Sequence, residues 1–62
     1  MMLKYTGKFY SGRKYTVKYC GIPTDAIFSH KTPDGLNFNV LSPIDGKWRN
    51  TFLLYSDVIC KQ

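Results

Sequence analysis

Five cations and no acid occur between residues 3 and 20, in the stretch LKYTGKFYSGRKYTVKYC. Four are lysines and one is an arginine: Lys4, Lys8, Lys14, Lys18 and Arg13. Ammonium and guanidinium groups that share a surface bind anions, and nucleic-acid phosphates in particular, because each contact releases condensed counterions. The chemistry that these residues could do is anion binding, provided that the fold brings them together.

The charge of the whole chain is uneven in the same way. Its 62 residues contain nine Lys and Arg against four Asp, with no Glu, for a net charge of +5. Residues 1–24 hold five cations and no acid, whereas residues 25–62 hold four of each. Net charge alone can serve solubility, but this asymmetry indicates a basic patch formed by the first third of the chain.

No other group of residues predicts catalysis or metal binding. His30 is the single histidine, and no group near it in sequence would orient a nucleophile and its base. The spacing of Cys20 and Cys60 fits no metal-binding pattern, and the isolated Asp residues are typical of turns. We therefore expect a protein that is not an enzyme and that holds no metal and no cofactor.

The sequence carries no signal for export or membrane insertion. The opening residues, MMLKYTGKFY, lack the apolar run of a secretory signal. No segment approaches the roughly 18–20 apolar residues of a membrane-spanning helix. We expect a cytoplasmic protein with no membrane partner and with two free thiols, because disulfides are rare in that compartment.

Turn residues recur at short intervals and divide the chain into strands. The turn signals are SG at 11–12, GIP at 21–23, TPDG at 32–35 and SPIDG at 42–46. The segments between them are rich in Tyr, Phe, Val, Ile and Thr, which is strand composition. We expect one all-β domain over residues 1–62, with strands at about 3–10, 13–20, 26–31, 36–41, 47–54 and 58–61.

The expected hairpin of residues 3–10 and 13–20 decides where the cations lie. Apolar and polar residues alternate in both segments, and successive side chains of a strand point to opposite faces. A three-residue loop at 10–12, with Gly12 left-handed, places both apolar sets on one face. The other face then carries Lys8 opposite Lys14 and Lys4 opposite Lys18. A register with residue 10 opposite 14 keeps these four lysines, the lysine face, together.

Aromatic residues near the cations add a second kind of contact. Tyr10 lies three positions before Arg13, and Trp48 with Arg49 follows the DGK turn. Aromatic rings stack on bases of any sequence, so these four residues join the lysine face as candidate nucleic-acid contacts. Tyr, Trp and Arg are also enriched at protein–protein interfaces, so an acidic protein surface is the competing partner.

With all six strands placed, the layout resembles the SH3-like small β-barrels. The likeness rests on the short hairpins at TPDG and IDGK and on the final stretch NTFLLYSDVICKQ. In such folds a strand ends in a single 3-10 turn, and a last short strand closes the barrel. The resemblance implies a five- or six-stranded antiparallel meander or barrel, and an OB-like barrel is the alternative fold.

Small basic barrels of this type include chromatin proteins, integrase C-terminal domains and RNA-binding domains, and others bind only proteins. The peptide groove of SH3 domains is not implied, because the acidic stretch of their first long loop is absent here. Fold does not fix function, so two hypotheses stand. One is a basic module that contacts DNA or RNA phosphates. The other is a phage or mobile-element type of protein that binds and modulates a host protein. Either would act as a monomer or a homodimer.

Overall fold

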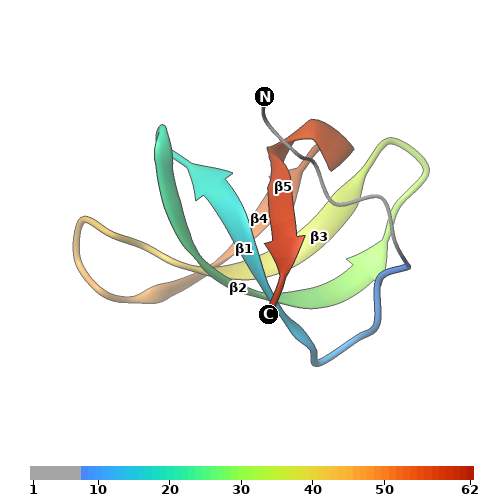
Figure 1. Ribbon diagram of the computed structural model, residues 1–62, viewed down its shortest axis with the longest axis horizontal. Coiled ribbons are helices and arrows are strands. Elements are labelled where there is room, and N and C mark those ends of the chain that lie inside the picture. The colour runs from blue at the N-terminus through green and yellow to red at the C-terminus, as the bar shows by residue number, and fades with distance from the viewer. Residues whose placement is uncertain (1–7) are drawn as a thin grey trace.

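The computed structural model describes residues 8–62, in which the regular elements are five β-strands and one 3-10 turn (Figure 1). The strands are β1 (Lys14–Tyr19), β2 (Ile22–Lys31), β3 (Leu36–Leu41), β4 (Trp48–Leu53) and β5 (Val58–Lys61), with η1 (Tyr55–Asp57) between β4 and β5. The expected all-β class is confirmed, and the last five expected strands are present. The largest change is in β2, which begins at Ile22 instead of residue 26.

The first expected strand, at 3–10, is wrong where the structure describes it. Residues 8–10 belong to no strand, and residues 3–7 lie outside the described part of the chain. Residues 8–10 lead into a turn in which the Arg13 amide donates to the Tyr10 carbonyl at 3.1 Å. Gly12 in this turn has a φ of 82°, so its expected left-handed conformation is confirmed. Glycine adopts that conformation without steric strain.

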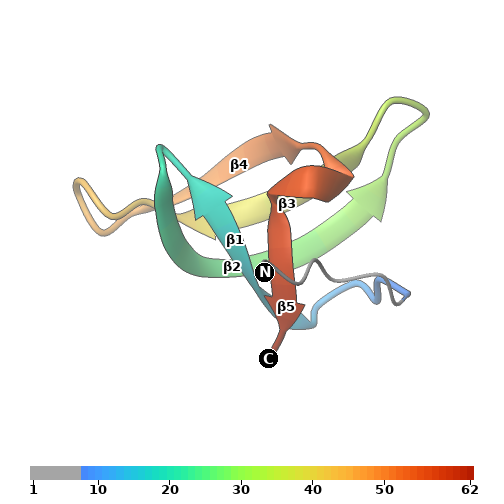
Figure 2. The same cartoon turned by 45° about the horizontal axis from the view of Figure 1, so that its top comes forward.

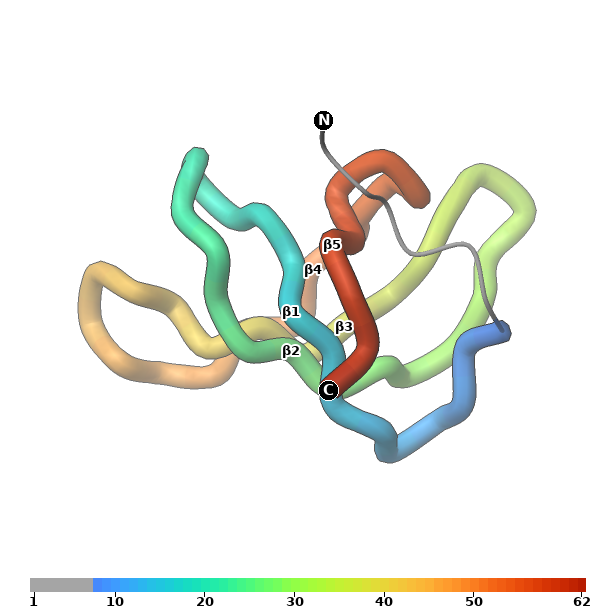
Figure 3. Tube along the Cα trace, in the orientation of Figure 1, coloured from blue at the N-terminus to red at the C-terminus, as the bar shows by residue number. Residues whose placement is uncertain are grey.

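All five strands form one antiparallel sheet in the order β4-β3-β2-β1-β5. β1 to β4 follow one another as hairpins, and β5 returns to the free edge of β1, beside which it runs in Figure 3. No ladder joins β4 to β5 within residues 8–62, so the sheet is an open meander with one crossover and not a closed barrel.

The β1–β2 hairpin turns at Cys20 and Gly21. Their φ angles are 54° and 75°, and positive φ at both central positions is what a type I′ turn requires. β2 then has an irregular register between Phe28 and His30. An extra residue at such a point bends a strand, and Figure 2 shows β2 curving strongly around the middle of the molecule. The bend lets one sheet enclose a core.

The inner face of the bent sheet holds the hydrophobic core. Its buried members are Tyr15, Val17, Ala26, Phe28, Leu36, Phe38, Val40, Leu53 and Val58. The Phe38 ring lies 6.1 Å from that of Phe9, 5.8 Å from that of Tyr15 and 5.3 Å from that of Phe28, in edge-on arrangements. Edge-to-face pairs of this kind are favoured by the aromatic quadrupole. The core is therefore an aromatic cluster centred on β3.

Tyr15 joins the leading segment to this core through its hydroxyl. The buried hydroxyl accepts a hydrogen bond from the Tyr10 amide at 2.9 Å and donates to the Lys8 carbonyl at 3.4 Å. Tyr15→Phe keeps the ring but removes the hydroxyl and both of its hydrogen bonds. We therefore expect the free energy of unfolding to fall by about 1–2 kcal/mol. Thermal melting should show a midpoint lower by roughly 4–16 °C.

The matched control for this substitution is Tyr19→Phe. Tyr19 is half-buried on the same strand, and its hydroxyl forms no hydrogen bond within residues 8–62. We expect its midpoint to stay close to that of the unmodified protein. Equal midpoints for the two variants would contradict an anchoring role for the Tyr15 hydroxyl.

Candidate nucleic-acid interface

The structure brings together part of the lysine face. Lys14 and Lys18 are exposed on the outer face of β1, because they alternate with the buried Tyr15 and Val17. This alternation was expected from the sequence and is confirmed. Lys4, with the pairing expected between it and Lys18, lies outside the described residues.

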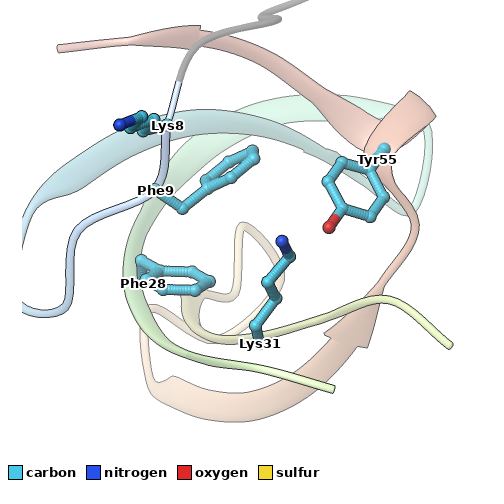
Figure 4. A pocket seen from close by; sticks show the side chains of 5 residues that line it. All are labelled: Lys8, Phe9, Phe28, Lys31 and Tyr55. Carbon is cyan, nitrogen blue, oxygen red and sulfur yellow. The ribbon is translucent and has the colours of Figure 1, made fainter. Parts of the chain in front are cut away.

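The expectation that Lys8 lies opposite Lys14 is wrong. Lys14 pairs with Ile27 of β2 on one side, and on the other side its carbonyl accepts the Gln62 amide at 3.1 Å. A strand has only two edges, and here β2 and the C-terminal segment take both. Lys8 instead lies at a pocket of about 380 Å³ together with Phe9, Phe28, Lys31 and Tyr55. In Figure 4 the ammonium of Lys31 points between the three rings, and that of Lys8 points away.

An acid lies between the two lysines of β1 on the outer face. Asp25 of β2 is the direct cross-strand partner of Thr16, which stands midway between Lys14 and Lys18. The Gln62 side-chain amide donates to the Asp25 carboxylate at 2.6 Å and to the Thr16 hydroxyl at 3.0 Å. The first 24 residues contain no acid, but the hairpin folds Asp25 back onto them. The middle of β1 is therefore not uniformly positive.

Another group of cations lies where β1 begins and β5 ends. Arg13 directly precedes Lys14, and Lys61 of β5 pairs with Tyr15. The Lys61 ammonium lies 5.4 Å from the centre of the Tyr10 ring, within cation–π range. Lys14 points to the outer face, whereas Lys61 and Tyr10 lie toward the inner one. We call Tyr10, Arg13, Lys14 and Lys61 the basic corner.

Lys61 was absent from the candidates that the sequence provides, whereas Tyr10, Arg13 and Lys14 were among them. Its position depends on β5 returning to β1, which is a contact between residues more than 40 positions apart. The signal that could have found it is the expected last strand at 58–61. The sequence predicted that strand but not its neighbour, and in the structure the neighbour is β1.

Arg49 and Trp48, which were expected to act together, lie on opposite faces of β4. Arg49 pairs with the buried Val40, so it lies toward the inner face, and its guanidinium forms an ion pair with Asp45. The Asp45 carboxylate accepts hydrogen bonds from the Lys47 backbone amide and from the Arg49 guanidinium. Both bonds lower the pKa of Asp45, and the bond from Lys47 has the larger effect. Arg49 therefore has a carboxylate partner at neutral pH, which the cations at the start of β1 and the end of β5 do not have within residues 8–62.

Trp48 belongs to a second exposed patch, on the outer face of β3 and β4. Three cross-strand pairs form it: Leu41 with Trp48, Asn39 with Asn50, and Asn37 with Phe52. Trp48 is 48% exposed and Phe52 is 50% exposed. We call these six residues the aromatic–amide face. The sequence identifies only Trp48 as a binding candidate, although the alternation of Asn with apolar residues is visible in it.

No family model, curated protein or solved structure matches this chain. Within residues 8–62, no helix is long and apolar enough to cross a membrane. No cluster of three potential metal ligands occurs among those residues either, and Cys20 and Cys60 are exposed free thiols. Function must therefore be argued from the charges, rings and amides of the surface.

Proposed function

We propose that this protein is a small basic binding module that contacts nucleic-acid phosphates through the basic corner. The observation that carries the proposal is a set of cations without carboxylate partners. Arg13, Lys14, Lys18 and Lys61 form no ion pair within residues 8–62, where the single ion pair is that of Arg49 with Asp45. Cations that no protein carboxylate neutralises keep their full attraction for an anionic polymer.

The SH3-like part of the proposal rests on connectivity. β1 lies between β2 and β5, the strands from β1 to β4 follow as a meander, and η1 comes directly before the last strand. This is the order of elements that the resemblance implies, in an open form. The arrangement matters for function because it places the start of β1, with Arg13 and Lys14, beside the end of β5, with Lys61.

Asp25 limits how many phosphates the surface can hold. A phosphate over the middle of β1 would meet the Asp25 carboxylate, whereas the basic corner offers three cations. We therefore expect about three phosphate contacts. Each contact contributes about 0.9 to the slope of log K against log salt for duplex DNA and about 0.7 for a single strand. The expected slope is thus about −2 to −3.

The test is fluorescence anisotropy with labelled oligonucleotides, single-stranded and duplex, titrated with the protein from about 50 to 200 mM salt. A slope of about −2 to −3 supports phosphate contacts. A slope near zero would contradict them, because an interface centred on apolar rings responds weakly to salt. Failure to bind any oligonucleotide at about 50 mM salt would overturn the proposal.

The second candidate function is a protein-interaction module of the phage or mobile-element type, which binds and modulates a host protein. The half-exposed Trp48 and Phe52 favour it, because interface centres are enriched in aromatic residues. β4 is also an edge strand within residues 8–62, and an edge can pair with a partner strand or with a second copy of the chain. Retention of a bound partner after nuclease treatment distinguishes this function from the first.

A further inference from the structure

The outer face of β4 presents two aromatic rings with an amide between them. Trp48, Asn50 and Phe52 point to the same side, since they occupy alternate positions of one strand. The two rings belong to residues about 13–14 Å apart along the strand, at about 3.4 Å per residue. Both rings are about half exposed, so each keeps part of its surface open to solvent.

The amides of this face hold one another in place. The Asn37 amide nitrogen donates to the Asn50 oxygen at 3.1 Å, and that of Asn50 donates to the oxygens of Asn37 at 2.6 Å and Asn39 at 3.3 Å. The amide nitrogen of Asn39 donates to no group within residues 8–62. The face thus combines amides held in one orientation with one exposed donor, the amide nitrogen of Asn39. Groups of this kind form hydrogen bonds with the edges of unpaired bases.

Phe52 is held in position by a glycine. A Cβ atom at Gly35 would lie 2.7 Å from the Phe52 ring and 2.7 Å from the Leu53 carbonyl oxygen. Only glycine therefore lets the ring lie this close to the 32–35 loop. The far edge of the ring therefore lies against the loop backbone, and about half of the side chain stays open to solvent.

The strand register connects this face to the basic corner. Lys14 pairs with Ile27, Ile27 pairs with Asn39, and Asn39 pairs with Asn50. These four side chains form one row across the outer face of β1 to β4. At about 4.8 Å between strands, the row spans about 14 Å. A polymer whose backbone lies at Lys14 can therefore reach Asn50 with its bases.

We propose that the aromatic–amide face binds unpaired bases, so that the ligand is single-stranded nucleic acid. This inference rests on the proposed phosphate contacts of the basic corner. In a duplex the bases are stacked on each other and show only their edges in the grooves. In a single strand they can lie on the Trp48 and Phe52 rings while the amides contact their edges. The occupant is a single-stranded segment because it alone offers free base faces next to phosphates.

Trp48 gives a direct test, since it is the only tryptophan in the chain. Titration with an oligo-dT strand should quench its fluorescence, with the same dissociation constant as the anisotropy of the labelled strand. A duplex of equal length should bind more weakly and leave the fluorescence unchanged. Trp48→Leu keeps an apolar side chain but removes the stacking surface. It should weaken single-strand binding about tenfold or more and leave duplex binding as it was.

Ile44→Ala is the matched control, because Ile44 is an exposed apolar residue outside both surfaces. It should change neither form of binding, and circular dichroism should show that both variants keep the sheet. Equal binding of single strand and duplex, with unchanged Trp48 fluorescence, would overturn this inference and leave the phosphate contacts intact. A Trp48→Leu variant that binds the single strand as tightly as the unmodified protein would also overturn it. Absence of binding to both ligands would overturn the proposed function and this inference together.

Discussion

Replacing Phe38 by Ala should remove most of the stability of the fold. Phe38 is fully buried at the centre of the aromatic cluster, with its ring edge-on to those of Tyr15 and Phe28. Removing a buried Phe side chain costs about 3–5 kcal/mol. At about 0.05–0.15 kcal/mol per residue, a chain of this length has only about 3–9 kcal/mol in total. The loss is therefore comparable to the whole stability.

Circular dichroism during thermal melting measures this outcome, and Phe52→Ala is the control. The control removes the same atoms from the neighbouring strand, where the ring is half exposed and the contact to Gly35 is peripheral. We expect Phe52→Ala to melt cooperatively, with a modestly lowered midpoint. A cooperative transition of Phe38→Ala close to that of the control would mean that the fold does not depend on the aromatic cluster.

The parts of the fold that could be predicted from the sequence are those that short-range chemistry determines. The TPDG loop closes on itself, because the Thr32 amide donates to the Gly35 carbonyl at 2.9 Å and the Gly35 amide donates to the Thr32 hydroxyl at 3.0 Å. The expected boundaries of β3 and β5 agree with the structure for the same reason. Turn residues and the alternation of apolar positions are local properties.

The choice of neighbour for an edge of β1 is not a local property. The alternation in residues 3–10 fits a strand beside β1. In the structure, however, β5 pairs with that edge of β1, and the paired residues are more than 40 positions apart in the sequence. Two segments with similar alternation of apolar and polar residues can each pair with the same edge of β1. The sequence pattern does not show which pairing is the more stable. The expected position of Lys8 was wrong for this reason, and Lys61 was missed for the same one.

A stretch of sequence with charges of one sign also need not form a surface of that sign, because folding can bring opposite charges beside it. Asp25 comes after the acid-free stretch, yet the hairpin sets it opposite Thr16, between Lys14 and Lys18. Arg49, by contrast, has its carboxylate partner, Asp45, only four residues away in the sequence. Candidate phosphate contacts could therefore be chosen from the sequence by residue type, but the structure decides which of them are still available to a ligand.

Charge reversal at the basic corner should abolish nucleic-acid binding. Lys14→Glu with Lys61→Glu removes two expected phosphate contacts and places two carboxylates next to the remaining Arg13. We expect a loss of at least about 100-fold in affinity at about 50 mM salt, and a slope of log K against log salt that is smaller by about 1.5–2. Both side chains are exposed, so the sheet should stay folded, and anisotropy measures the binding.

The control is Lys31→Glu with Lys47→Glu, which makes the same change in net charge at exposed sites away from the corner. Lys31 lies at the pocket beside Phe28, and Lys47 ends the loop between β3 and β4. If binding depends on specific contacts, this variant should lose less than about tenfold and keep its slope. If the two double variants lose affinity equally, the attraction comes from the net charge of the chain, and Lys14 and Lys61 have no special place in it.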